Sequence, residues 1–353
     1  MVGLFLIAGN IRAQKDSTNH HFRLKGFPIV YYTPETRWAG GAAGVATFYG
    51  QYPTDTLYPS SVGISFIYTQ EKQVLAYFPY NLYFNHGKYW LYGELGYYQY
   101  NYYFYGTGNQ VDPDFREYYS ASFARIRLTA LQRIKDKYTY AGIKYAFDDI
   151  KTSNLDSTGL LYDGSITGSL GGRVSGIGFV VNRDTRNHKF FPTKGTMAEF
   201  FVYGEDNFTG STFKYLRFTL DATGYFSIKN KHVFATHVNA VYINGAPPFT
   251  HMGMLGGYRR LRGYYEGRYR DNCMLLAQAE YRWMFWWRLG VVAFGGMGAV
   301  AHTPDKFALN NIRFSGGGGL RFMLDKKQRI NLRIEYAFGK NSSGAYLTIG
   351  EAF

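Results

Sequence analysis

The sequence predicts an all-β fold, a single 16-stranded antiparallel transmembrane β-barrel. The first observation is a two-residue alternation: over residues 273–283 and again over 329–338, apolar side chains alternate with Gln, Glu, Arg or Asn. The second is composition, with 34 Tyr and 29 Phe but no continuous apolar run of the roughly 18 residues that a membrane helix needs. Lone charges on one face of strand after strand indicate a wet lumen, which distinguishes a barrel from a soluble sheet.

Turn signals divide the chain into sixteen expected strands. Tight connections at 33–36, 85–87, 229–231 and 325–327 are rich in Pro, Gly, Asn, Asp and Lys and are typical of turns between antiparallel neighbours. We expect strands over residues 27–32, 38–50, 60–70, 73–84, 88–105, 117–130, 136–148, 170–183, 196–206, 212–227, 231–243, 273–284, 288–301, 312–324, 328–339 and 345–353.

Three connections are longer and richer in Gly, Asn and Asp: residues 106–116, 151–169 and 244–272. Counting strands places all three at the same end of the barrel, and outer-membrane barrels keep their long loops outside. We therefore expect both termini on the periplasmic side. No internal repeat or composition shift divides the chain, so residues 27–353 are interpreted as one barrel domain.

The N-terminus begins with a short apolar stretch over residues 2–8. Residues 1–14 are interpreted as the end of a secretory signal that lacks its basic start, and residues 15–26 as a short periplasmic tail. The alternative is a plain apolar N-terminus with no targeting role.

The net charge of +14 raises the question of an acidic partner. Nucleic acid is not expected, because the cations mostly alternate with apolar residues on strands and form no basic run. The single cysteine, Cys273, is interpreted as a small apolar residue at a strand start rather than a reactive thiol. The chain has no Gly-x-Ser-x-Gly sequence and no His or Cys spacing typical of a metal site. We therefore expect no catalytic residues, no metal and no cofactor.

Four local motifs occur in order along nearly the whole chain, and with them the chain resembles the bacterial surface antigen family, the BamA and TamA type of outer-membrane assembly barrel. They are a first outer turn at Tyr32–Thr36, an inner turn between strands eight and nine with Asp184, Arg186, Pro192 and Gly195, a sixth-loop motif Leu261-Arg262-Gly263-Tyr264, and a last strand with Gly350 and the terminal aromatic Phe353.

The resemblance implies that the sixth loop folds into the lumen. A guanidinium offers five donors in a rigid fork, so Arg262 could fix the loop through one carboxylate on the wall, and Glu280 is the expected partner. Gly263 would allow close approach to the wall. The alternative is an exposed basic loop that touches lipid phosphates through its other arginines, Arg259, Arg260, Arg268 and Arg270.

Two departures from the family pattern matter. The family commonly has an acidic residue near a Gly in the thirteenth strand, but the matching residues 294–298 contain none, so we expect the arginine to lack a second acidic anchor. The family's assembly machines also carry periplasmic POTRA domains, for which we expect no counterpart in this polypeptide.

The expected function is outer-membrane protein assembly or translocation in a Gram-negative bacterium. Lipopolysaccharide would surround the barrel, and separate periplasmic assembly proteins or lipoproteins would be its partners. A short first strand starting with Phe27-Pro28 would form a weak seam with the last strand, and a poorly paired edge can template an incoming strand. The alternative is a channel or structural barrel that shares only the fold.

Overall fold

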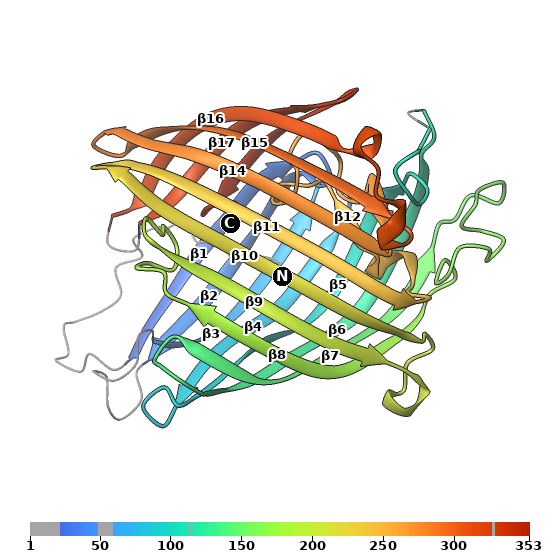
Figure 1. The fold of residues 1–353 in the computed structure, drawn as a ribbon, viewed down its shortest axis with the longest axis horizontal. Coiled ribbons are helices and arrows are strands. Elements are labelled where there is room, and N and C mark those ends of the chain that lie inside the picture. The colour runs from blue at the N-terminus through green and yellow to red at the C-terminus, as the bar shows by residue number, and fades with distance from the viewer. Residues whose placement is uncertain (1–21, 49–58, 113, 327–328) are drawn as a thin grey trace.

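The computed structural model describes residues 22–48, 59–112, 114–326 and 329–353, and they form a closed barrel of sixteen antiparallel strands (Figure 1). Neighbours in the sheet follow chain order, and β1 closes the barrel against β18. A further two-stranded sheet, β12 and β13, lies in the loop between β11 and β14. The expected fold is confirmed. The expected signal over residues 1–14 lies outside the described residues.

The strand bounds follow the sequence alternation closely in the middle of each strand. In the first half they are β1 (Phe22–Thr33), β2 (Arg37–Phe48), β3 (Ser60–Thr69), β4 (Val74–Phe84), β5 (Tyr89–Phe104), β6 (Glu117–Arg133), β7 (Thr139–Ser153), β8 (Gly172–Asp184) and β9 (Gly195–Glu205). In the second half they are β10 (Tyr215–Lys229), β11 (His232–Gly245), β12 (Gly253–Leu255), β13 (Tyr269–Asp271), β14 (Cys273–Trp286), β15 (Leu289–Ala301), β16 (Arg313–Asp325), β17 (Ile330–Gly339) and β18 (Ser342–Ile349).

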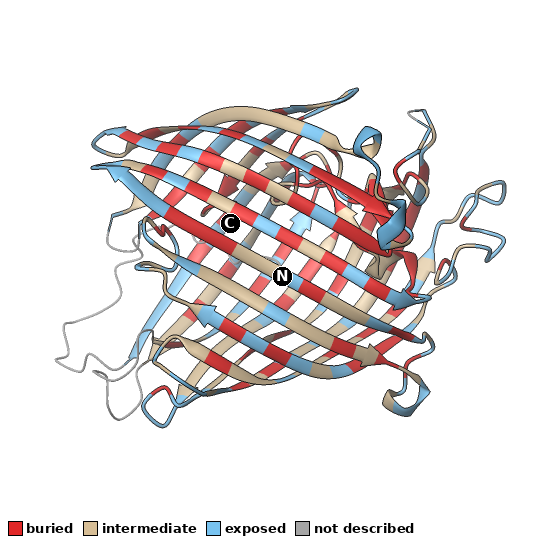
Figure 2. Cartoon of the chain, viewed as in Figure 1, coloured by how far each residue is buried: buried red, intermediate tan, exposed pale blue. Residues whose placement is uncertain are grey.

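Each strand has one face to the lumen and one to the surroundings, and β11 illustrates it. Val233, Ala235 and Val241 are buried on the lumen side, whereas Phe234 and Val238 are exposed on the outer face. Figure 2 shows the same alternation of buried and exposed residues along most strands. Large apolar side chains on an outer face fit a lipid environment, in which they are covered by acyl chains.

The long connections gather at one end of the barrel, on the right of Figure 1. This outer end carries the connections after β5, β7 and β11, as the strand count predicts, and also residues 206–214 and 302–312. At the opposite, inner end most of the described connections are short turns, and the longest is residues 185–194 between β8 and β9. Among the described residues the only helices are four three-residue 3₁₀ segments, and none is long and apolar enough to cross a membrane.

The two strands at the seam differ from expectation. β1 begins at Phe22, five residues earlier than expected, so part of the expected periplasmic tail belongs to the sheet and the first strand is not short. Its register with β2 runs without interruption through Pro28, so the proline does not shorten it. β18 ends at Ile349, and the expected strand end at Phe353 is wrong, because Gly350 takes a φ of +83° that turns the chain out of the sheet.

Candidate functional site: the sixth loop and the seam

The sixth loop, residues 246–272, folds back into the barrel. Its short strands β12 and β13 pair through three residues each, which holds the two halves of the loop together. Leu255, Leu261 and Tyr264 are fully buried and pack against lumen-facing residues of the barrel wall. Burial of these three apolar side chains stabilises the inward conformation by roughly 1.5 to 3 kcal/mol each.

Arg262 lies at the tip of the inward fold and is 1% exposed. Its Nη2 donates to Oε1 of Glu280 on β14, and its Nη1 donates to Oε2 of Glu335 on β17 at 2.8 Å. The guanidinium also stacks over the Phe294 ring, 3.6 Å from the centroid. Burial works to lower the pKa of Arg262, but the two carboxylates outweigh it and raise that pKa. The charge therefore stays on the guanidinium, and the loop is held at two strands of the wall.

Glu280 is the partner that the sequence predicts, whereas the absence of a second acidic anchor was a wrong expectation. Glu335 supplies that anchor from β17, two strands beyond the stretch in which the family pattern places it. The sequence did carry a signal, since Glu335 alternates with apolar residues and so faces the lumen. Only the path of the loop through the lumen could show that it meets Arg262.

The Arg262 contacts belong to a larger buried cluster of ion pairs. Three wall arginines surround the same carboxylates: Nε of Arg282 lies 2.8 Å from Glu280, Nη2 of Arg321 lies 3.2 Å from Glu280, and Nη1 of Arg333 lies 3.0 Å from Glu335. Buried charges in such a cluster depend on one another, because removing one leaves its partners without compensation.

The chain after β18 joins this cluster. Glu351 accepts from Nη2 of Arg321 at 2.7 Å and from Nδ2 of Asn331 at 2.8 Å. Phe353 stacks on the ring of His237, with centroids 5.0 Å apart. Burial would raise the pKa of Glu351, but Arg321 and Arg282 lower it to about 2. Gly350 and Phe353 therefore mark a tail held inside the lumen rather than the end of a strand.

Gly263 and Tyr264 complete the docking of the motif. Gly263 takes a φ of +103°, and a Cβ atom there would lie 2.8 Å from the backbone of Phe338, so only glycine fits this close approach. The Gly263 N–H donates to the Tyr346 hydroxyl of β18 at 2.9 Å. The Tyr264 hydroxyl donates to the carbonyl of Phe314 at 2.9 Å. The motif is thereby tied directly to the last strand.

The loop is also attached on two other sides of the lumen. Nε2 of His251 lies 2.7 Å from the buried Asp148 carboxylate of β7, to which Arg125 of β6 donates at 2.9 Å. The backbone N–H of Glu266 donates to Oε1 of Glu35, in the outer turn between β1 and β2, at 2.9 Å. Burial raises the pKa of Glu35 to about 7, and the Glu266 carboxylate adds to the rise. The loop thus crosses the barrel from wall to wall.

The other loop arginines do not form the exposed basic surface considered above. Arg270 is 2% exposed; its Nε donates to the carbonyl of Gly267, and its guanidinium lies over the rings of Phe104 and Phe249. Arg259 donates to the carbonyl of Ala352 in the tail. These cations stabilise the inward fold instead of facing lipid.

The inner-turn motif lies at the opposite end of the barrel and does not join this site. Asp184 ends β8 and accepts from Nη2 of Arg186 at 2.7 Å, and Gly195 begins β9. Pro192 is buried within the turn. Cys273 begins β14 with its side chain buried, as the sequence predicts.

The seam between β1 and β18 is much shorter than any other ladder of the barrel. One residue pair is in register here, Tyr32 with Leu347, against six to sixteen in the other ladders between described barrel strands. The cause is geometric. The tail leaves the sheet at Gly350 and is held in the lumen by Glu351, so it does not extend along the inner part of β1.

Among the described residues, no group of three or more His, Cys, Asp or Glu side chains is placed to hold a metal ion. The site consists of a docked loop, a charged cluster and an incomplete ladder.

A family model, the Omp85 superfamily domain, matches residues 52–353. The chain belongs to the Omp85 superfamily. Its fold resembles BamA from Haemophilus ducreyi lacking POTRA domains 1–3, with a TM-score of 0.63 at 18% identity over 94% of this chain and 70% of that one.

It also resembles CdiB from Acinetobacter baumannii, with a TM-score of 0.62 at 11% identity, and CdiB from Escherichia coli, with a TM-score of 0.62 at 10% identity. Both matches cover 95% of this chain, but it spans only 60% and 64% of the length of those two chains. No curated protein sequence matches significantly. The family and the barrel place this protein in the outer membrane of a Gram-negative bacterium.

Proposed function

We propose that this Omp85 barrel assembles or translocates outer-membrane proteins by opening sideways between β1 and β18. The observation that carries the proposal is the single register pair at the seam, Tyr32 with Leu347. Backbone groups of β1 that have no ladder partner form an edge to which an incoming strand can add. A client strand would pair there and leave into the lipid without crossing the lumen.

The docked sixth loop supports a lateral route over an axial one. Arg262 fastens the loop at β14 and β17, His251 fastens it at β7, and the loop lies between these walls. Sixteen strands would otherwise leave a water-filled channel. We expect low and unsteady conductance in planar bilayers. Large steady pores would favour the alternative of a channel.

A disulfide across the seam tests the lateral route. Tyr32→Cys with Leu347→Cys would join residues that face each other, in a Cys273→Ser background that removes the native thiol. The matched control is Ala42→Cys with Phe66→Cys, which face each other in the continuous ladder of β2 and β3.

The expected result is loss of outer-membrane proteins in cells with the seam crosslink, to the level seen on depletion of the gene, and recovery with a reductant. The control crosslink should leave the outer-membrane protein profile unchanged. An unchanged profile in both strains, with complete crosslinking shown on a gel, would contradict the proposal.

We further propose that separate periplasmic assembly proteins or lipoproteins deliver clients to the inner end of the seam, and that lipopolysaccharide contacts the outer end of the barrel. The barrel acts without chemical catalysis in this proposal, because strand exchange replaces one set of backbone hydrogen bonds by another. Crosslinking from the inner part of β1, for example from Leu24, should capture such a partner if one exists.

A further inference from the structure

The inner end of the barrel carries a large excess of positive over negative charge. At its described ends and turns there are fifteen Lys and Arg residues against three Asp, which leaves an excess of twelve positive charges out of a total of +14. We call this set the inner rim. It comprises residues 22–26, 85–89, 133–139, 183–195, 228–232, 284–289, 323–326 and 329–330.

The outer end differs sharply from the inner rim. Apart from the sixth loop, the described outer turns and loops, together with the strand ends beside them, carry nine Lys and Arg against ten Asp and Glu, so they are close to neutral. Among the inner acids, Asp136 pairs with Arg183 at 2.8 Å and Asp184 pairs with Arg186 at 2.7 Å. The excess at the inner rim is therefore not compensated by neighbouring carboxylates.

Several rim cations lie on aromatic rings at the lipid boundary. Nζ of Lys88 lies 5.5 Å from the centroid of the Tyr89 ring, and Nζ of Lys326 lies 4.9 Å from that of Trp287, which is 64% exposed. Nζ of Lys137 lies 5.1 Å from the Tyr138 centroid. Aromatic rings settle at headgroup level in membranes, so these contacts place the cations at the depth of lipid phosphates.

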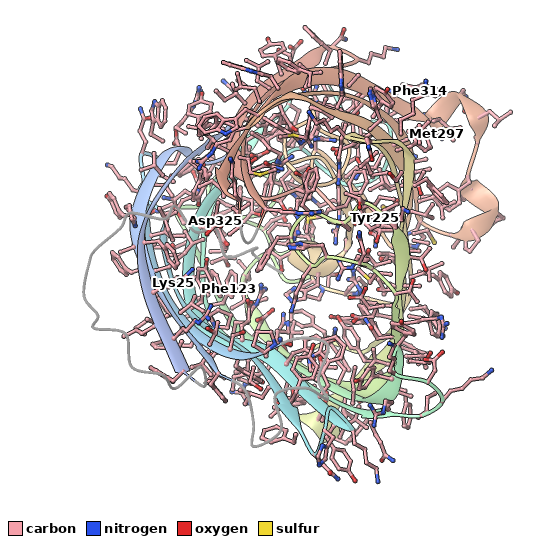
Figure 3. All side chains as sticks on the ribbon, turned by 90° about the vertical axis from the view of Figure 1, so that its left-hand side faces the viewer. Lys25, Phe123, Tyr225, Met297, Phe314 and Asp325 are labelled. Atoms are coloured by element: carbon pink, nitrogen blue, oxygen red, sulfur yellow. The ribbon has the colours of Figure 1, made fainter. Side chains whose placement is uncertain are left out.

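Among the described residues, the charge also extends around most of the barrel. The start of β1 and each inner turn from the one between β4 and β5 around to the one between β16 and β17 contribute at least one Lys or Arg. Figure 3 views the barrel from this end, with Lys25 on the β1 side and Asp325 at the end of β16. A protein partner would need a patch on one side, whereas a lipid leaflet meets the whole circumference.

We propose that the inner rim binds anionic phospholipid headgroups of the leaflet around it, through phosphate contacts of its lysines and arginines. Each Lys or Arg close to an anionic surface gains attraction that falls off within a Debye length. The leaflet is the periplasmic one if the barrel has the orientation that the strand count predicts, but the binding itself does not depend on the seam or on client assembly.

Tryptophan fluorescence can test this binding in the full chain refolded into vesicles. Four of the five tryptophans, Trp90, Trp283, Trp286 and Trp287, lie near the inner end of their strands. A Trp38→Phe background removes the one at the outer end. Brominated phosphatidylglycerol quenches only tryptophans that it contacts, so titration against unbrominated phosphatidylcholine measures the relative binding constant at the inner rim.

We expect a relative binding constant of at least about two in favour of phosphatidylglycerol over phosphatidylcholine at low salt. At high salt this constant should approach one, because salt screens the attraction. Replacing Lys88, Lys137, Lys229 and Lys326 together by Gln should lower this preference, because it removes four of the rim cations. The matched control loses the same number of outer lysines, namely Lys72, Lys151, Lys306 and Lys340.

The outer control should keep the preference. A relative binding constant of one for the wild-type protein, which means no preference for phosphatidylglycerol over phosphatidylcholine, would overturn the proposal. A relative binding constant that salt does not change would also overturn it. Either result would favour an acidic periplasmic protein as the partner of the inner rim. Because the wild-type protein alone can give that result, the test remains decisive even if a quadruple variant folds poorly. Equal loss in both quadruple variants would also contradict it, since it would show an effect of net charge alone.

Discussion

The two walls beside the seam face the same lumen but hold their contents differently. On the C-terminal side, strands β14–β18 meet the sixth loop and the tail through buried ion pairs centred on Glu280 and Glu335. On the N-terminal side, strands β1–β6 present aromatic rings, with Tyr77, Tyr98 and Tyr100 stacked at centroid distances of 6.0 and 5.8 Å.

The barrel therefore has one wall whose contacts hold the loop and the tail in place, and one wall whose contacts can shift slightly. Ion pairs need a particular partner at a particular place, so the charged wall fixes the loop and the tail. Stacked rings tolerate small shifts, because dispersion contacts and ring offsets vary smoothly. The seam lies between the two, where a strand of the aromatic wall meets a strand that the charged wall draws inward.

Removing the central cation should have the largest effect. Arg262→Ala removes a cation that Glu280 and Glu335 share, and loss of one member of a buried pair costs about 3 to 5 kcal/mol. Urea titration in detergent, followed by the gel shift of folded against heated protein, would measure the loss. Arg268→Ala is the control, since Arg268 is less buried and has no carboxylate partner among the described ion pairs. Equal effects of the two changes would contradict a docked loop.

Releasing the tail should have a smaller and more local effect. Glu351→Gln keeps the shape of the side chain but removes charge-assisted hydrogen bonds to Arg321, which are worth about 1.5 to 3 kcal/mol. The rate of amide hydrogen exchange should rise in β18, including at Tyr346, before it rises in β14. Exchange that rises equally around the barrel would show that the tail does not control the seam.

The contact between Glu35 and the sixth loop should depend on pH. The pKa of Glu35 is raised to about 7, so the folded state keeps its proton at a pH where the unfolded chain has lost it. The contribution of Glu35 to the stability of the barrel therefore becomes less favourable as pH rises from about 4.5 to about 7, and stays less favourable above that range. Glu35→Gln should flatten this dependence, with the largest gain over wild type above pH 7. A melting curve series that shows the same pH dependence in both proteins would contradict it.

The smallest effect is expected within the ring stack. Tyr98→Phe keeps the aromatic contacts and removes only a hydroxyl that donates to Glu94 at 3.1 Å, a change worth about 0.5 to 1.5 kcal/mol in unfolding free energy. The same urea titration measures it. A loss as large as that of Arg262→Ala would show that the aromatic wall depends on polar contacts as strongly as the charged wall does.

Local pattern was enough to predict the barrel and part of the site. Alternation requires only that neighbouring side chains point to opposite faces, so β14 and β17 and their lumen-facing carboxylates follow from the sequence. The counting of turns placed the long loops at one end. The pairing of Arg262 with Glu280 came from the family resemblance together with the chemistry of the guanidinium, and the structure places the two side chains in an ion pair.

Other features depend on distances between residues far apart in the sequence, which a local sequence pattern does not specify. The apolar-polar alternation gives no sign that β18 stops at Ile349, because the tail is drawn inward by Arg321 and Asn331 on other strands. The early start of β1 depends on its register with β2 as far as Phe48. The second anchor of Arg262 was missed for the same reason, since the path of the loop decides which carboxylate it reaches.

The sequence by itself determined the periodicity, the strand number and the lumen-facing charges, because each is a property of neighbouring residues or of turn counting. Only the tertiary structure decided which charges meet, where the last strand ends and how little of β1 pairs with β18. The physical reason is closure. Bringing strand sixteen of the barrel to strand one fixes the stagger of every strand between them, and that stagger sets the distances across the lumen.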